Sequence, residues 1–285
     1  MVRSGVPAPL RPLGREAMVK AGAKGIDMQK PDWVIDKERD KRASAAETVW
    51  LFGLHAVRDA LLNPVRQRLR LVLTKNALDR LQDAVTASGM QPEVVDPRRF
   101  EVPIDPASVH QGAALEAKPL YWGSLEERCI SGAGRPLVVL LDQVTDPHNV
   151  GAVLRSAEVF GARAVIATLR NSAPETGALA KTASGALERQ PYLRVKNLAD
   201  AMVDLRAMGY ALLGLDGAAE TALDTAVARL KGRPMALVLG AEGPGLREKT
   251  RETCDQLVHI APAGPFGSLN VSNAAAVALY AATRD

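Results

Sequence analysis

Polar and glycine residues that could take part in chemistry gather in three short segments of the chain. Each segment follows an aliphatic run and leads into a helical pattern, at residues 140–162, 237–248 and 260–280. Parallel α/β sheets bind their ligands at the carboxyl ends of the strands. These three strand-to-helix junctions are therefore the places where we look for a functional site.

The first junction, DPHNVGAVLRSAEVFGA, contains Asn149 and Arg155. They lie six positions apart, or about 240° around an ideal helix, so Asn149 acts from the turn while Arg155 projects from the helix. Spacing alone favours ordinary roles for both. Asn149 would cap the helix, as Asn does well, and Arg155 would form a surface ion pair with Glu158 or Asp142.

The second junction, LVLGAEGPGLRE, is a buried strand that runs into a glycine turn at Gly240, Gly243 and Gly245. Glycine lets backbone N–H groups approach a ligand closely. The pattern is not GxGxxG and no P-loop lysine follows, so it does not favour a dinucleotide or ATP. Glu242 disfavours a phosphate and suits a cation or a hydroxyl. The alternative is a carboxylate placed at a helix entry by the helix dipole.

The third junction, IAPAGPFGSLNVSNAAAVALY, brings Ser268, Asn270 and Ser272 to the start of a helix. Capping explains one or two of these side chains but not the whole set. The helix that follows is rich in alanine, at residues 274–276, 278, 281 and 282. Small residues of this kind allow backbones to pack very closely.

The elements that must position these residues fall into two α/β series. The first has strands at 49–52, 69–74 and 93–95 and helices at 53–62 and 78–88. The second has strands at 136–141, 164–168, 192–195, 210–215, 236–240 and 257–260 and helices at 149–160, 177–187, 198–208, 246–254 and 270–282. Such alternation predicts an α/β fold with a mostly parallel sheet covered by helices on both faces. We expect a small α/β domain at 47–120, a linker at 121–135 and a larger domain at 136–285.

Composition excludes several classes of protein. Hydrophobic residues make up 47% of the 285 residues, and no apolar run approaches the ~20 residues that span a bilayer. Cys129 and Cys254 are too few for a disulfide framework and lack zinc-site spacing, and the four histidines are scattered. We expect a cytoplasmic protein with two reduced, partly buried thiols, no bound metal and no membrane span.

The charge of the chain is concentrated at its N-terminus. The chain carries 36 Lys and Arg against 32 Asp and Glu, and the whole excess of +4 lies in residues 1–46. Pro and Gly interrupt any helix there, which predicts a flexible basic arm. Such an arm favours a polyanion, most often nucleic acid, although a solvated tail kept for solubility has the same composition.

In their order along the chain, the three junctions resemble the three signature motifs of the SpoU-type RNA 2′-O-ribose methyltransferases, in the knotted SPOUT superfamily. The matching segments are DPHNVGAVLRSAEVFGA, LVLGAEGPGL and IAPAGPFGSLNVSNAAAVALY. The segments LFGLHAVRDALL and VHQG resemble the small N-terminal substrate-binding domain of that family. The resemblance covers roughly residues 49–285 and does not extend to the arm.

The resemblance implies an α/β sheet tied in a trefoil knot, S-adenosylmethionine as cofactor, an RNA substrate and a homodimer. The dimer would use the first-motif helix and the last helix. By similarity, the residues that hold the cofactor are Gly240, Ile260 and Leu269, largely through backbone groups. By similarity, the catalytic residues are Asn149, Arg155, Glu242, Ser268 and Asn270.

The reaction that the resemblance implies is methyl transfer to a ribose 2′-hydroxyl. Arg155 is the family's usual candidate for activating the hydroxyl. A guanidinium is a poor base. We therefore expect Arg155 to bind the adjacent phosphate and to stabilise the developing alkoxide. The added N-terminal domain resembles the branch that methylates a guanosine of 23S-type ribosomal RNA.

Three alternatives stay open at this point. The substrate could be transfer RNA rather than ribosomal RNA. The chain could be an RNA-binding module that has lost catalysis, although the intact motif residues count against this. It could also be a nucleotide-dependent enzyme on an ordinary doubly wound fold, against which the missing GxGxxG and Walker lysine count.

Overall fold

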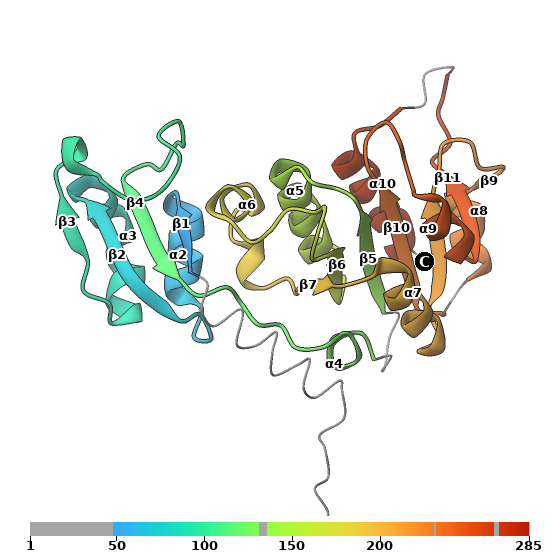
Figure 1. The fold of residues 1–285 in the computed structure, drawn as a ribbon, viewed down its shortest axis with the longest axis horizontal. Helices are drawn as coiled ribbons and strands as arrows, with labels where there is room; N and C mark the ends of the chain where they lie inside the picture. The colour runs from blue at the N-terminus through green and yellow to red at the C-terminus, as the bar shows by residue number, and fades with distance from the viewer. Residues whose placement is uncertain (1–47, 131–135, 231, 265–267, 285) are drawn as a thin grey trace, which may run out of the picture. The chain divides into compact units, whose positions relative to one another are not determined.

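The computed structural model describes residues 48–130, 136–230, 232–264 and 268–284, and two separate β-sheets organise them (Figure 1). The described residues of both sheets belong to one compact unit. The basic arm expected at 1–46 lies outside the described residues. In the described part of the chain, no helix is long and apolar enough to cross a membrane.

The smaller sheet has the strand order β1-β4-β2-β3, in which β4 runs antiparallel to both β1 and β2 while β2 and β3 are parallel. Its strands are β1 (Val49–Phe52), β2 (Arg68–Thr74), β3 (Glu93–Val95) and β4 (Ala113–Ala117), and its helices are α2 (Leu54–Leu62), α3 (Lys75–Ser88) and the short η1 (Pro97–Arg99). The sequence did not predict β4, because its residues, AALEA, have little intrinsic preference for strands. Burial against β1 and β2 decides its structure.

The larger sheet is parallel throughout and has the order β7-β6-β5-β10-β8-β11-β9. Its strands are β5 (Leu137–Asp142), β6 (Ala164–Thr168), β7 (Tyr192–Val195), β8 (Ala211–Leu215), β9 (Thr221–Ala222), β10 (Met235–Gly240) and β11 (Gln256–His259). The central strands β5 and β10 are aliphatic and buried along almost their whole length, as strands covered on both faces must be. The expected α/β fold with a mostly parallel sheet is confirmed.

Helices cover both faces of this sheet. They are α4 (Leu125–Cys129), α5 (Pro147–Val159), α6 (Gly177–Ala183), η2 (Ala186–Glu188), α7 (Leu198–Ala207), α8 (Leu223–Arg229), α9 (Glu248–Thr253) and α10 (Val271–Thr283). Successive residues of a strand point to opposite faces. Leu137, Val139 and Leu141 of β5 therefore pack with α5, α6, α8 and α10, while Val138 and Leu140 pack with α4 and α7.

Three local details differ from the sequence expectation. The helix expected at 177–187 ends at Ser184, which takes a left-handed conformation (φ 49°) before the short turn of η2. The elements β9 and α8 were not expected. The segment expected as a linker carries α4, whose N-terminus has a capping box in which Ser124 and Glu127 bind each other's backbone N–H groups.

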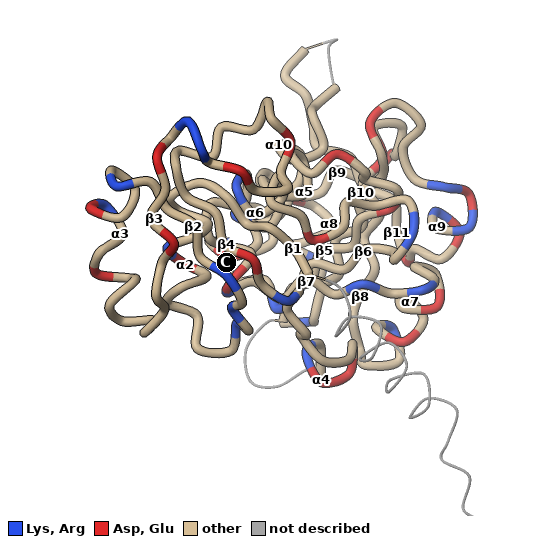
Figure 2. The backbone as a smooth tube through the Cα atoms, turned by 60° about the vertical axis from the view of Figure 1, so that its left-hand side comes forward, with Lys and Arg blue, Asp and Glu red and all other residues tan. Residues whose placement is uncertain are grey.

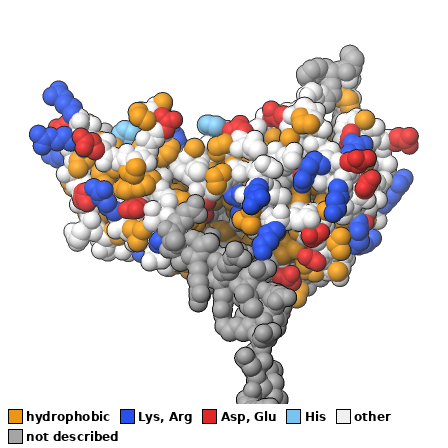
Figure 3. Space-filling model, in the orientation of Figure 1, with side chains coloured by type: hydrophobic (Ala, Val, Ile, Leu, Met, Phe, Trp, Pro, Cys, Tyr) orange, Lys and Arg blue, Asp and Glu red, His pale blue; other side chains and the backbone are white. Residues whose placement is uncertain are grey.

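Positions of Lys and Arg are interspersed with positions of Asp and Glu along the described backbone (Figure 2). The face shown in Figure 3 likewise mixes Lys and Arg with Asp and Glu, separated by apolar side chains. This distribution agrees with the charge balance outside residues 1–46.

Candidate functional site

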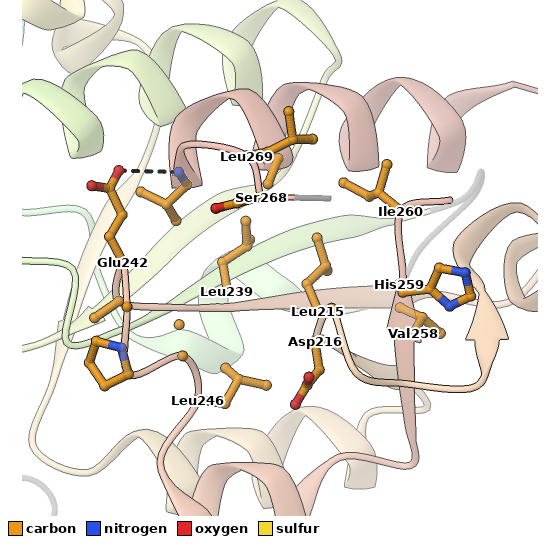
Figure 4. A pocket seen from close by; sticks show the side chains of 18 of the residues that line it. Leu215, Asp216, Leu239, Glu242, Leu246, Val258, His259, Ile260, Ser268 and Leu269 are labelled. Carbon is orange, nitrogen blue, oxygen red and sulfur yellow. Dashed lines mark hydrogen bonds between the residues drawn. The ribbon is translucent and has the colours of Figure 1, made fainter. Parts of the chain in front are cut away.

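A cavity of about 530 Å³ opens where three parallel strands of the larger sheet end (Figure 4). Leu215 and Asp216 line it at the end of β8, Gly240 at the end of β10, and His259 and Ile260 at the end of β11. Its volume is within the usual range for sites that bind small molecules and cofactors. The carboxyl ends of the strands thus form a pocket, as expected for a parallel sheet.

The glycine turn after β10 forms one wall of the cavity. The N–H of Gly245 donates to the carbonyl of Ala241 at 3.0 Å, so the turn folds back over the end of the strand. A Cβ atom on Gly240 would lie only 2.1 Å from the backbone carbon of Gly245. Gly243 and Gly245 both have positive φ angles, which side chains disfavour. The turn therefore needs its glycines and presents backbone groups to the cavity.

Asn149, Glu242 and Asn270, one from each junction, form a single hydrogen-bonded cluster. Asn149 Nδ2 donates to Glu242 Oε1 at 3.2 Å, and Asn270 Nδ2 donates to Asn149 Oδ1 at 2.9 Å and also to Glu242 Oε1. The backbone N–H of Val271 donates to the same carboxylate oxygen at 3.4 Å. Residues up to 121 positions apart in the sequence thus meet at the rim of the cavity, where Glu242 is a lining residue.

The structure changes two of the ordinary roles that spacing favoured. The N-cap of α5 is Asp146, whose carboxylate accepts from the N–H of His148 at 2.9 Å, so Asn149 is free to reach Glu242. Glu242 does not lie in a first helical turn, since α9 begins at Glu248. Asn270 does act as a cap, because its Oδ1 accepts from the backbone N–H and the hydroxyl of Ser272.

Arg155 stands apart from this cluster. It lies on the exposed side of α5 and does not line the cavity. Neither expected ion-pair partner binds it: Asp142 accepts from Arg247, and Glu158 accepts from Arg189. In the described residues, no ion pair involves Arg155, so its guanidinium faces solvent.

The remaining predicted residues lie at the cavity. Ser268 and Leu269 line it from the segment before α10, and Ile260 lines it from the segment after β11 (Figure 4). Leu269 is 47% exposed, so an apolar side chain stands at the opening. A slot of this kind, with apolar walls and backbone donors and acceptors, suits a flat heteroaromatic ring.

Sequence reasoning missed several residues of the lining. Asp216 forms an ion pair with Arg251 at one side of the cavity, and the Nδ1 atom of His259 is buried with no hydrogen-bond partner. The only signal in the sequence was that Asp216 and His259 stand at the ends of strands. Within the described residues, His, Cys, Asp and Glu side chains do not gather in threes as a metal site would require.

Comparison with known proteins identifies the family of this chain. A family model described as the SpoU rRNA Methylase family matches residues 136–280. The 23S rRNA (guanosine-2'-O-)-methyltransferase RlmB of Ralstonia nicotianae is 42% identical over 239 residues, which are 82% of this chain and 94% of that protein. The protein of the same name from Photobacterium profundum is 40% identical, over 82% of this chain and 96% of its own length.

Solved structures show the same fold. The SpoU methyltransferase AviRb from Streptomyces viridochromogenes, in complex with AdoMet, has a TM-score of 0.68 at 23% identity, over 86% of this chain and 92% of its own. A putative RNA methyltransferase of the TrmH family from Porphyromonas gingivalis has a TM-score of 0.65 at 25% identity, over 90% of this chain and 98% of its own. Since the family model matches half of the chain and relatives about 40% identical cover four fifths of it, the chain belongs to the SpoU rRNA methylase family.

Proposed function

We propose that this protein transfers a methyl group from S-adenosylmethionine to a ribose 2′-hydroxyl of RNA, at a guanosine of large-subunit ribosomal RNA. The observation that carries the proposal is the Asn149–Glu242–Asn270 cluster at the rim of a cavity. The choice of ribosomal RNA is supported by the relatives that are named for 23S guanosine methylation and match about four fifths of this chain.

The cavity fits the cofactor in size and in the kind of groups that line it. Gly240 and Ile260 would offer backbone partners to the adenine edge, and Leu269 would cover its face. The buried, unpartnered Nδ1 of His259 is a further polar atom in this wall. When bound, the cofactor supplies a methyl group already activated by a positive sulfur.

The chain's own residues then have to align the 2′-hydroxyl and handle its proton. Glu242 accepts from both amides and thereby fixes Asn149 and Asn270, so that the second N–H of the Asn149 amide and the Ser268 hydroxyl can position the ribose. Alignment of this kind supplies a large part of the rate of a transfer reaction. Arg155 keeps its charge, binds the neighbouring phosphate and stabilises the developing alkoxide, while the proton leaves to phosphate or water.

The same proposal includes a homodimer formed through α5 and α10. The two helices pack against each other, and Phe160 contacts Tyr280 edge to face at 6.1 Å. Beside this contact, Val159, Val277 and Tyr280 are 77%, 41% and 47% exposed. A second copy of the chain would cover these apolar side chains and bring the solvent-facing Arg155 against another protomer.

A trefoil knot in the C-terminal segment is also part of the proposal. After β11, the chain returns in α10 to pack against α5, α8 and β10. That return path is what a threaded C-terminus requires. True knots are rare, so the support here is the resemblance to knotted methyltransferases rather than any local pattern.

RNA would be bound mainly by parts of the chain outside the cavity. The small α/β part at 47–120 offers exposed Arg98 and Arg99 next to the stacked rings of Phe100 and His110, a combination that suits unpaired RNA. The basic arm at 1–46 would add phosphate contacts that weaken with salt. The proposal includes a cytoplasmic location, which a ribosomal RNA substrate supports.

The test is methyl incorporation from labelled S-adenosylmethionine into ribosomal RNA and transfer RNA that lack native modifications, followed by nucleoside analysis. We expect 2′-O-methylguanosine in the large ribosomal RNA. Methylation of transfer RNA alone would replace the substrate assignment and keep the reaction. Cofactor binding without incorporation into either pool would point to an assembly intermediate as substrate, and absence of cofactor binding would leave an RNA-binding module.

A further inference from the structure

Arg66 is a fully buried arginine that joins the part of the chain containing the smaller sheet to the part containing the larger one. Its side chain is 0% exposed and follows α2 in the smaller part. Nε and Nη2 donate to the two carboxylate oxygens of Glu188, at 3.0 and 2.5 Å. Nη1 donates to Glu175 at 2.5 Å and to the carbonyl of Lys118 at 2.8 Å. Both glutamates belong to the α6–η2 region of the larger part.

The polar groups around Arg66 complete this network. Asn63 Nδ2 donates to the carboxylate and to the carbonyl of Glu188, at 2.9 and 3.2 Å. The second oxygen of Glu175 accepts from the N–H of Leu120 at 3.1 Å. Buried charges are tolerated only when their hydrogen bonds are satisfied, and a bidentate Arg–carboxylate pair is the strongest and most directional of such contacts. The network thus specifies one arrangement of the residues that meet in it.

A second arginine extends the connection to the helix of the candidate site. Arg189 directly follows Glu188 and donates to Asp59 of α2 at 2.7 Å and to Glu158 of α5. The helix α5 also carries Asn149 and Arg155. Ion pairs therefore run from α2 through Arg189 to α5.

The backbones of the two parts also pack closely against each other where these parts meet. A Cβ atom on Gly177, at the start of α6, would lie 2.3 Å from the backbone carbonyl oxygen of Trp50 in β1. One continuous apolar cluster also includes buried residues of both sheets. The two parts touch over apolar surface, and the Arg66 network is the buried directional element within that contact, beside the exposed contacts of Arg189 with Asp59 and of Lys181 with the Val109 carbonyl.

We propose that Arg66 is a positioning residue for RNA methylation, which with Glu175 and Glu188 fixes the smaller α/β part at a set spacing from the candidate site. The proposal rests on the proposed function. One RNA that contacts both parts behaves as a bivalent ligand, and its affinity depends on the effective concentration of the second contact. Loosening the junction lowers that effective concentration without altering either contact surface. Affinity for RNA then falls, while the cofactor cavity and the chemistry at saturating RNA stay intact.

The variants Arg66→Lys and Glu188→Gln test this at nearly constant volume. Lysine keeps the charge but lacks the planar guanidinium that donates hydrogen bonds to both carboxylates and to the Lys118 carbonyl at once. The matched control is Arg70→Lys, because Arg70 makes the same bidentate pair with Glu93, at 2.9 and 2.8 Å, entirely within the smaller sheet. Thermal unfolding identifies any variant that fails to fold. If Arg66→Lys does not fold, Glu188→Gln alone serves as the test variant.

The first measurement is the distance distribution between spin labels at Ala87→Cys on α3 and Asp200→Cys on α7, two exposed positions. Burial raises the pKa of both native thiols, Cys129 and Cys254, to about 12, so the introduced cysteines react first. We expect one narrow distribution in the parent protein and the Arg70→Lys control. We expect a broad one in Arg66→Lys and Glu188→Gln.

The second measurement is steady-state kinetics with RNA and equilibrium binding of S-adenosylmethionine. We expect KM for RNA to rise about tenfold in the two junction variants, with kcat and cofactor affinity within about twofold of the parent. An unbroadened distance distribution, or broadening with an unchanged KM, would overturn the positioning role. If the parent protein transfers no methyl group, the proposed function fails separately, and RNA binding affinity replaces KM in the same comparison.

Discussion

Asn149 and Arg155 lie on the same helix but in different surroundings. Asn149 contacts Glu242 and Asn270 at the cavity, whereas Arg155 faces solvent with both nearby carboxylates occupied by other arginines. An arginine on a protein surface that binds no carboxylate of its own chain is available to a phosphate. This difference explains why we assign Asn149 to ribose positioning and Arg155 to charge stabilisation.

Replacing Arg155 by Ala is expected to lower turnover by about 10²-fold or more, because a charge that stabilises the transition state is lost. The fold should be retained, since Arg155 is exposed. The measurement is single-turnover methyl transfer, with thermal unfolding as the check on folding. Arg229→Ala, an exposed arginine of α8, is the matched control and should behave like the parent. Near-normal turnover of Arg155→Ala would remove Arg155 from the mechanism.

At the scale of elements, the glycine turn after β10 leaves no space for a side chain at Gly240. Gly240→Ala would force a Cβ atom against the backbone of Gly245. We expect a loss of about 1–3 kcal/mol in the free energy of unfolding. We also expect at least a tenfold loss of cofactor affinity, about 1.4 kcal/mol, because the turn is a wall of the cavity. Calorimetry gives both quantities.

The matched control is Gly264→Ala, in the loop after β11, where an added Cβ atom meets nothing within 4 Å. This substitution should leave stability and cofactor affinity close to those of the parent. Equal effects of the two substitutions would mean that the close approach at Gly240 is not what shapes the cavity.

Glu175, in the segment before α6, gives a prediction about pH. Burial raises the pKa of its carboxyl above the ordinary value of 4.5, and the charge of Arg66 only partly opposes this. The folded state therefore binds the proton more tightly than the unfolded state. As pH falls from neutrality through the raised pKa toward 4.5, the parent should gain stability relative to Glu175→Gln, which does not titrate there.

The measurement is the difference in free energy of unfolding between the parent and Glu175→Gln at several pH values. The exposed Glu93→Gln variant is the contrasting control. The Arg70 guanidinium holds the pKa of Glu93 below 4.5, so its stabilising effect is lost as pH falls. If the free-energy difference between the parent and each variant changed in the same direction with pH for Glu175→Gln and Glu93→Gln, burial could not be the cause of the Glu175 effect.

For the whole molecule, the distribution of charge leads to a prediction about RNA binding. The excess of +4 lies in residues 1–46, and charges of both signs are interspersed elsewhere (Figure 2). Deleting residues 1–46 should weaken RNA binding at low salt and flatten its salt dependence, because fewer counterions are released. Cofactor affinity should not change. Titrations at several salt concentrations measure both effects, and an unchanged salt slope would refute a role for the arm in binding RNA.

The sequence alone predicted much of the fold and the family. Alternating strands and helices predicted a parallel α/β sheet, since the periods of buried residues are local properties of the chain. The three glycine- and amide-rich junctions are the segments that contribute the Asn149–Glu242–Asn270 cluster at the rim of the cavity. Their residue types also carried the resemblance that the family match then confirmed.

Only the tertiary structure decided which of these residues meet. Asn149, Glu242 and Asn270 are brought together by the ends of distant strands, whereas Arg155 is exposed and does not line the cavity. The Arg66 network left no pattern in the sequence, because its partners at Glu175 and Glu188 are more than 100 positions away. The strand β4 was missed because burial between neighbours, not intrinsic preference, sets its conformation. The periodicity of the sequence reflects local conformation only. Hydrogen bonds between residues far apart in the sequence depend instead on the packing of the whole fold.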